Sequence, residues 1–209
     1  MIFKKDELRL LWPFYAYYLV YGLSLAIMPF MMVYFRNIGF SFLQIAGILT
    51  GYGIATILLE IPTGAFADGY SRKKSVIIGM VIGGISVALI PLTNNFIVLI
   101  FLWAVAGLGM TFVSGAEEAW VVDNLRQQKR KRLEQEFFIK SQSIVAFGAI
   151  FAPFLGTLIV KNASIKALWY VFAAGFIINA LILHLFGKES YTPKRQKLLQ
   201  AIKKTIHTS

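Results

Sequence analysis

The chain has 209 residues, of which 57% are hydrophobic and only 15% are charged, and its mean hydropathy is +0.67. About a quarter of the residues of soluble domains are charged, so this composition excludes an ordinary water-soluble protein. The formal net charge of +11 does not indicate nucleic-acid binding, because the basic residues lie in short segments between long apolar ones. Cysteine is absent from the sequence, which excludes disulfides and thiolate metal sites.

Long stretches without charge predict transmembrane helices. No charged residue occurs in 10–35, 75–116, 141–160 or 167–187, whereas about 20 apolar residues are enough to cross a bilayer. A proline, a threonine and two asparagines interrupt the second stretch, which predicts a turn there. Backbone groups in hydrocarbon must be paired within each span, which favours helices over strands. The predicted spans, in chain order, are 11–35, 42–67, 75–91, 95–122, 141–160 and 165–187.

The basic residues indicate how the spans are oriented. With the amino terminus in the cytoplasm, eighteen Lys and Arg residues lie on the cytoplasmic side and three lie outside. The three are Arg36, Lys161 and Lys166. Because cytoplasmic loops are enriched in Lys and Arg, we predict a multi-pass protein of the cell membrane with both termini in the cytoplasm. Residues 1–187 are expected to form one six-helix unit, and 188–209 a basic tail that is either an amphipathic surface helix or disordered.

Small residues recur at four-residue spacing in three of the predicted spans. They are Gly47 and Gly51, Gly79 and Gly83, and Gly148, Ala152 and Gly156. This spacing places each set on one face of its helix, and small residues let two helix backbones approach closely. We therefore expect helix contacts at these faces.

The segment between the second and third predicted spans carries a characteristic pattern. It consists of Gly64-Ala65-Phe66-Ala67-Asp68-Gly69-Tyr70-Ser71-Arg72-Lys73-Lys74. The pattern resembles the signature loop of the major facilitator superfamily, in which a glycine, three residues and an aspartate precede a glycine, an arginine and two further basic residues. Gly69 stands where the family often has a basic residue, and Ser71 replaces the usual second glycine.

This resemblance implies an all-α membrane protein. Members of the superfamily normally have twelve helices in two six-helix halves, each built from 3+3 inverted repeats, with the substrate bound between the halves. The chain resembles the amino-terminal half, and the residues after 187 resemble the start of the central loop. We therefore expect a truncated or split transporter whose partner is the missing carboxy-terminal half or a second copy of the chain.

The same resemblance implies a function. It is that of a secondary active transporter, not an enzyme, acting in the lipid bilayer on a small-molecule substrate by proton-coupled efflux or exchange. No cofactor is implied, and a proton gradient is the expected driving force.

The motif residues are expected to form a conformational latch. Arg72 lies one helical turn beyond Asp68 and offers a bidentate partner to a carboxylate, while Gly64 allows a neighbouring helix to pack tightly. In the family, the aspartate and arginine are thought to pair with the opposite half and with an acidic residue at the cytoplasmic end of the fourth helix. Asp123 occupies that place here, and Lys73 belongs to the same motif.

A second resemblance lies in the fifth predicted span. It comprises Gly148, Ala152, Pro153 and Gly156, which resemble the proline-glycine motif of the antiporter branch. Ala152 and Thr157 replace glycines, and Ile139 stands where an earlier glycine is expected. A kinked helix with small packing residues is the alternative interpretation. In the fourth span, Trp103 precedes two aligned glycines but the usual arginine is missing, so the proton-coupling role of that position is not implied.

Three acidic residues lie inside predicted spans, where a charge costs at least about 2.5 to 3.5 kcal/mol. They are Glu60, Glu117 and Glu118. Glu60 and Glu117 are expected about 9 to 12 Å inside the cytoplasmic boundary, and adjacent residues point about 100° apart on a helix. We expect these acids to exchange protons or bind a cationic group, with Tyr21 and Gln142 as further candidates for the same cavity. The alternative is that they are protonated or hydrogen-bonded ties between helices.

Two other functions are compatible with six spans. The chain could be a six-helix assembly partner that needs a second half or forms a dimer. It could also be an intramembrane serine protease, because Ser114 and His184 fall at similar depth in the fourth and sixth spans, although the usual glycine before the serine is missing.

The predicted orientation can be tested by labelling single cysteines, because the sequence contains none of its own. Cysteines introduced at positions 70, 130 and 200 should react only with permeant reagents, and those at 38, 93 and 163 also with impermeant ones. The reason is the excess of Lys and Arg on one side. External labelling at position 130 would contradict the six-span topology.

Overall fold

A computed structural model describes residues 5–190, and the structure is entirely helical over this range. The elements are α1 (Lys5–Ser24), the 3₁₀ turn η1 (Leu25–Ile27), α2 (Met28–Asn37), α3 (Phe42–Gly69), α4 (Arg72–Leu89), the 3₁₀ turn η2 (Ile90–Leu92), α5 (Phe96–Val113), α6 (Ala116–Gln127), α7 (Leu133–Asn162) and α8 (Ala167–Phe186). They form six spans long and apolar enough to cross a membrane, which confirms the all-α fold with six helices. The amphipathic helix predicted within 188–209 falls almost wholly outside the described residues.

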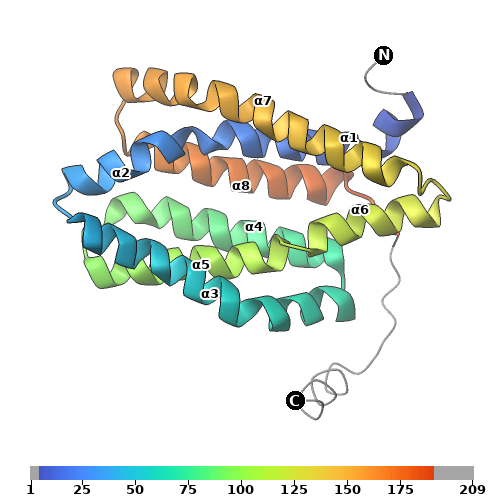
Figure 1. Cartoon of the computed structure of the whole chain (residues 1–209), viewed down its shortest axis with the longest axis horizontal. Coiled ribbons are helices and arrows are strands. Elements are labelled where there is room, and N and C mark those ends of the chain that lie inside the picture. The colour runs from blue at the N-terminus through green and yellow to red at the C-terminus, as the bar shows by residue number, and fades with distance from the viewer. Residues whose placement is uncertain (1–4, 191–209) are drawn as a thin grey trace, which may run out of the picture.

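The first and fourth spans each consist of two helices. In the first span, η1 separates α1 from α2, and Pro29 at the start of α2 lacks the N–H that would continue the helical hydrogen bonds. In the fourth span, α5 ends at Val113, and Gly115 has a φ of 69°, a left-handed conformation that glycine adopts without strain. The predicted single spans 11–35 and 95–122 are thus each interrupted (Figure 1).

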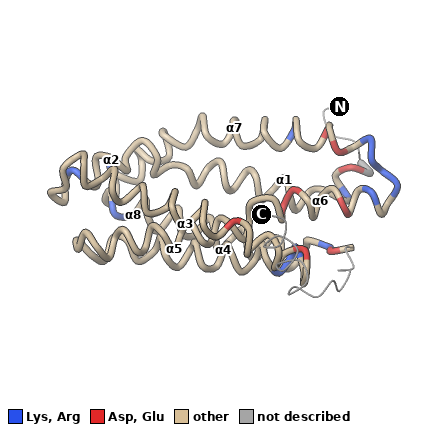
Figure 2. Tube along the Cα trace, turned by 60° about the horizontal axis from the view of Figure 1, so that its bottom comes forward, with Lys and Arg blue, Asp and Glu red and all other residues tan. Residues whose placement is uncertain are grey.

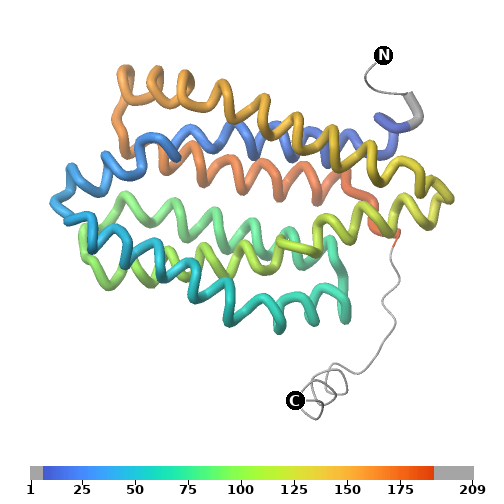
Figure 3. Tube along the Cα trace, in the orientation of Figure 1, coloured from blue at the N-terminus to red at the C-terminus, as the bar shows by residue number. Residues whose placement is uncertain are grey.

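The helix contacts follow the symmetry of an inverted repeat. The first span packs through α1 against α7 and α8, whereas the fourth span packs through α5 against α3 and α4. The remaining large contact joins α4 to α8, the third and sixth spans. Exchanging spans one to three with spans four to six maps the contacts of α1 onto those of α5 and maps the contact of α4 with α8 onto itself. Because each repeat has three spans, the two repeats have opposite orientations. The two layers are visible in Figures 1 and 3.

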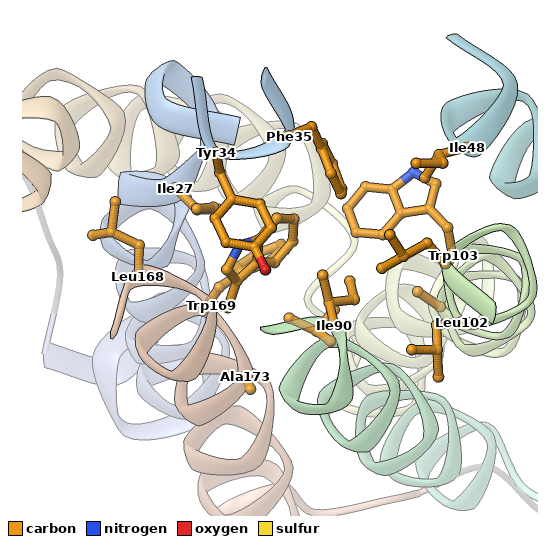
Figure 4. Packing of buried hydrophobic residues seen from close by; sticks show 14 of the residues in the cluster. Ile27, Tyr34, Phe35, Ile48, Ile90, Leu102, Trp103, Leu168, Trp169 and Ala173 are labelled. Atoms are coloured by element: carbon orange, nitrogen blue, oxygen red, sulfur yellow. The ribbon is translucent and has the colours of Figure 1, made fainter. Parts of the chain in front are cut away.

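A cluster of aromatic side chains fills the bundle near one end. Trp169 of α8 is fully buried and meets Tyr34 of α2 edge-on, with ring centroids 5.3 Å apart at 69°. Trp103 of α5 meets the same indole at 5.8 Å and 86°. Figure 4 shows these rings converging with Phe35 between the helices. Edge-to-face packing of this kind adds to the burial of apolar surface, so the cluster joins both layers of the bundle.

Glycines bring α1 and α7 into backbone contact. A Cβ atom added to Gly148 would lie 3.0 Å from the Cα atom of Gly22, and one added to Gly156 would lie 2.7 Å from the carbonyl oxygen of Ala26. Ala152, one turn between them on α7, is fully buried. Pro153 lies inside α7 with an exposed side chain. The predicted small-residue face of the fifth span therefore lies against the first span.

Replacing Gly148 by alanine should destabilise the bundle, because the new Cβ would meet the backbone of Gly22 and force α1 and α7 apart. Overpacking of this kind costs about 1–3 kcal/mol. The measurement is thermal unfolding in detergent, followed by tryptophan fluorescence. Gly53→Ala is the control, since a Cβ at Gly53 would have no atom within 4 Å. Equal melting temperatures for the two variants would contradict the assigned contact.

Candidate functional site: a charged loop and a buried carboxyl group

Most charged residues lie at one end of the bundle, as Figure 2 shows. This charged end is where α1 and α7 begin and where α3, α6 and α8 end. The motif loop between α3 and α4 is part of it. The sharp turn is fixed by Ser71, whose extended backbone precedes α4 and whose hydroxyl accepts the N–H of Lys74 at 3.0 Å.

Arg72 stands between two carboxylates. Its Nη1 atom lies 2.6 Å from Oδ2 of Asp123 on α6, and its Nη2 atom lies 3.4 Å from Oδ1 of Asp68 on α3. The Arg72 and Asp123 side chains are 15% and 25% exposed, whereas the Asp68 side chain is 69% exposed. The structure thus brings the three predicted charged residues together, with Asp123 as the closer and more buried partner.

Lys73 makes contacts that its place in the motif did not predict. Its Nζ atom donates to the carbonyl oxygens of His184 at 2.8 Å and Gly187 at 2.7 Å, at the end of α8. The carbonyl end of a helix carries partial negative charge, which a lysine there stabilises. Lys73 therefore ties the third span to the sixth.

Glu189 is a member of the cluster that the sequence analysis missed. One carboxylate oxygen accepts the hydroxyl of Ser71 at 2.6 Å, and the other accepts the backbone N–H of Lys73 at 3.1 Å. An acid at the start of a helix satisfies free N–H groups and complements the helix dipole. Glu189 is the only acidic residue after Glu136, which is the signal that could have singled it out.

The segment after α8 is also held by α6. The carbonyl oxygen of Lys188 accepts from Trp120 Nε1 at 3.0 Å and from Asn124 Nδ2 at 2.7 Å. The N–H of Ser190 donates to Asn124 Oδ1 at 3.0 Å. The motif loop, α6 and the segment 187–190 are therefore joined by one network of charges and hydrogen bonds.

The expected close packing at Gly64 is wrong for the part of the chain that the structure describes. A Cβ atom at Gly64 would have no neighbouring atom within 4 Å. The backbone contacts between helices lie instead at other glycines, such as Gly107 of α5 against the carbonyl of Tyr52 on α3.

The intramembrane acids lie in different surroundings. Glu117 is in the first turn of α6, just after the break at Gly115, and is only 6% exposed. Tyr18 of α1 donates its hydroxyl to Glu117 Oε1 at 2.6 Å. Glu118 and Glu60 are exposed, and within residues 5–190 the Glu60 carboxylate makes no hydrogen bond or ion pair.

An aromatic cavity lies in the middle of the bundle. It measures about 270 Å³ and includes Tyr21, Tyr52, Trp103, Met110, Phe172 and Phe176 among its lining residues. A much smaller cavity shares three of these residues and adds Tyr17 and Asn179. The Asn179 side chain is buried, and its oxygen has no hydrogen-bond partner within the described part of the chain. An apolar pocket with a few polar groups is the usual form of a small-molecule site.

The aromatic side chains connect this cavity to Glu117. Tyr17 packs edge-on against Tyr18, with centroids 4.9 Å apart, and stacks on Tyr21 at 6.4 Å. Tyr21 lines both cavities, whereas Glu117 lines neither and is linked to them through Tyr18 and Tyr17. Gln142 is exposed on α7 and does not line either cavity.

A buried ion pair, also missed from the sequence, joins the starts of α1 and α7. Lys140 Nζ lies 2.7 Å from Oε2 of Glu7 and 3.3 Å from Oε2 of Glu136. Tyr15 donates to the other oxygen of Glu7 at 2.6 Å. The Glu7 side chain is only 1% exposed, so this pairing holds the first and fifth spans together at the charged end.

The inverted repeat of six spans and the charged loop between spans two and three define one half of a secondary-transporter fold. The chain belongs to the major facilitator superfamily, because the family model described as Major Facilitator Superfamily matches residues 14–208. The family consists of transporters, so the protease interpretation is rejected. The side chains of Ser114 and His184 are both exposed, and no hydrogen bond joins them within the described residues.

Three curated relatives show how much of a transporter the chain represents. An uncharacterized transporter of Buchnera aphidicola is 27% identical over 96% of this chain and 49% of its own length. The uncharacterized MFS-type transporter YxaM of Bacillus subtilis is 26% identical over 69% of this chain and 37% of its own length. The quinolone resistance protein NorA of Staphylococcus aureus is 22% identical over 93% of this chain and 49% of its own length. The chain spans at most about half the length of these relatives.

Removing the Asp123 carboxylate should slow the transport cycle without weakening substrate binding. Asp123→Asn leaves the partly buried Arg72 without its closest partner, which costs more than an intact pair contributes. In the full-length natural protein we expect turnover to fall by about tenfold and the apparent substrate affinity to change little. The measurement is uptake into proteoliposomes over a range of substrate concentrations.

Glu134→Gln is the control for this substitution, because it removes a pair with the exposed Arg126 at the same end of the bundle. Asp68→Asn combined with Asp123→Asn should act non-additively, since both carboxylates contact Arg72. Loss of equilibrium substrate binding in Asp123→Asn, or simple addition of the two effects, would argue against a shared latch.

Proposed function

We propose that the chain is the amino-terminal half of a secondary active transporter that exchanges protons for a small aromatic molecule across the cell membrane. Its place as the first half is supported by the motif loop between spans two and three, followed after span six by a basic segment suited to a central loop. The charge bias of the loops supports a cytoplasmic position for both ends.

The buried carboxyl group of Glu117 carries the proposal of proton coupling. Its side chain is only 6% exposed and accepts a hydrogen bond from the Tyr18 hydroxyl of α1 at 2.6 Å. Acidic residues inside membrane spans are candidates for proton transfer by default. A change in the contact between α1 and α6 during the transport cycle would change the surroundings of this carboxyl group, and can thereby load or release a proton. The break between α5 and α6 at Gly115 lies two residues before Glu117. Movement of α6 about this break would therefore carry the Glu117 carboxyl group with it.

The aromatic cavity suggests the class of substrate. Its walls supply rings for stacking, and Tyr21, Tyr52 and Asn179 supply the few polar groups that orient a ligand. One relative is named for quinolone resistance, and quinolones are flat aromatic molecules. Quinolones are therefore the first compounds to test as substrates.

The cluster of Asp68, Arg72 and Asp123 serves, in this proposal, as a latch on one conformation of the cycle. Asp68 is the exposed member and is thus placed to contact the other half of the transporter. Lys73 and Glu189 position the loop by joining it to the end of α8. The latch biases the balance between inward-open and outward-open states and does not contact the substrate.

A dimer of this chain is the alternative to a separate second half. The exposed Glu60 on α3 favours coverage by protein or by a water-filled pathway, because a carboxylate facing lipid costs several kcal/mol. Gln142 on α7 is exposed in the same way. A cross-linked dimer formed through cysteines at positions 60 and 142 in native membranes would favour the assembly of two copies over a single long chain.

The role of Glu117 can be tested by replacing it with glutamine in the full-length protein. Glu117→Gln keeps the side-chain shape and an acceptor for Tyr18 but can no longer bind or release a proton. We expect loss of quinolone transport driven by a pH gradient, while exchange of quinolone across proteoliposomes without a gradient persists. Glu118→Gln, on the exposed neighbour, is the control and should retain both activities. Normal gradient-driven transport by Glu117→Gln would refute the proposed coupling.

A further inference from the structure

A third cavity lies at the charged end of the bundle, and none of its lining residues belongs to the aromatic cavity or to the motif loop. It measures about 560 Å³ and lies between the beginning of α1, the end of α6 and the end of α8. Its polar lining residues are Arg9, Arg130, Lys188, Asn124 and Gln128. The pocket therefore combines three cationic side chains with two amides, which are hydrogen-bond donors.

The positive charges of Arg9 and Lys188 are not balanced by the lining of this pocket. None of the lining residues within 5–190 carries a carboxylate. The side chains of Arg9 and Lys188 make no hydrogen bond or ion pair with the residues that the structure describes. Like charges gathered on one concave surface repel each other, so an anion bound there would stabilise the arrangement.

The carbonyl groups at the end of α8 do not oppose an anion in the pocket. The carbonyl oxygens of His184 and Gly187 already accept from Lys73, on the other side of the helix end. The carbonyl oxygen of Lys188 is engaged by Trp120 and Asn124. The partial negative charge at this helix end is thus largely satisfied by donors of the protein.

The other wall of the pocket is apolar and exposed. Trp12 of α1 packs against Phe186 of α8 with ring centroids 4.8 Å apart, and the two residues are 41% and 50% exposed. Leu185 beside them is 66% exposed. Aromatic residues at the ends of spans lie at the level of lipid headgroups. The pocket therefore combines an apolar wall suited to the edge of a bilayer with cations suited to its charged surface.

We propose that this pocket binds an anionic phospholipid, with the phosphate between Arg9 and Lys188 and the glycerol and upper acyl chains against Trp12 and Phe186. Arginine and lysine both bind phosphate oxygens, and basic pockets between transmembrane helices at the cytoplasmic surface suit anionic headgroups. A soluble phosphate compound would use the cations but leave the apolar wall without a role. Because the pocket has both a cationic wall and an apolar wall, it favours a lipid over a soluble phosphate compound.

Bound lipid would also reinforce the network at the charged end. The pocket includes Asn124 and Lys188, and Asn124 holds the segment after α8 through the Lys188 carbonyl. A ligand that binds only the folded arrangement stabilises it in proportion to its occupancy.

The test uses the purified full-length natural protein in a neutral detergent and measures binding by native mass spectrometry and by the melting temperature. The probes are phosphatidylglycerol, phosphatidylcholine and glycerol 3-phosphate. We expect phosphatidylglycerol to bind saturably and raise the melting temperature, and the other two probes to have little effect. The double variant Arg9→Gln/Lys188→Gln should weaken phosphatidylglycerol binding by about tenfold or more.

The matched control is Lys131→Gln/Arg132→Gln, which removes two exposed charges at the same end that do not line the pocket. This control should bind phosphatidylglycerol normally. Trp12→Gln tests the apolar wall separately and should weaken phosphatidylglycerol binding with all cations in place. Equal binding of phosphatidylcholine, or equal loss in the control, would overturn the site. Binding of glycerol 3-phosphate as strong as that of phosphatidylglycerol would overturn the lipid as its ligand.

Discussion

The lack of water in the bilayer is the constraint on which the rest of this structure depends. Backbone N–H and C=O groups must be paired within each span, which leaves helices as the only element for a chain of this kind. The usual hydrophobic drive between helices is weak there, so contact depends on close approach of backbones. The meeting of Gly148 with Gly22, and of Gly107 with Tyr52, supplies that approach at related places in the two layers. Close packing of helix backbones thus stabilises the middle of the bundle, and ion pairs and hydrogen bonds stabilise its charged end.

The two interrupted spans follow from the same constraint. A helix can break inside a membrane only where other parts of the protein satisfy the freed backbone groups or shield them. The breaks at η1 and at Gly115 occur in the first and fourth spans, which correspond to each other in the inverted repeat. Each of these spans packs against two spans of the opposite repeat, the first against α7 and α8 and the fourth against α3 and α4. Broken helices at corresponding positions of a repeat are where transporters of this architecture place their binding sites.

Polar interactions divide the molecule into two functional regions. At the charged end, Arg72, Lys73 and Glu189 link the motif loop to α6 and to the segment after α8. Inside the bundle, Glu117 has a single hydrogen bond from Tyr18 and lies next to the aromatic side chains that lead to the cavity. A shift of α6 would move Asp123 and Glu117 together, because both belong to this one helix. This shared helix gives a physical route by which the proposed proton loading and the proposed latch can affect each other.

The sequence alone determined the six spans and the all-α fold, because hydropathy and charge are local properties of the chain. The resemblance of the motif loop to its family predicted the meeting of Arg72 with Asp123. Only the tertiary structure decided which residues far apart in the sequence contact each other. It placed Lys73 at the end of α8 and brought Glu189 to the start of α4. Within the described residues, it left no atom within 4 Å of a Cβ added at Gly64. It also separated Glu117, buried beside Tyr18, from the exposed Glu60 and Gln142. Composition cannot distinguish these acids, since whether a carboxyl group is buried depends on which helices pack around it.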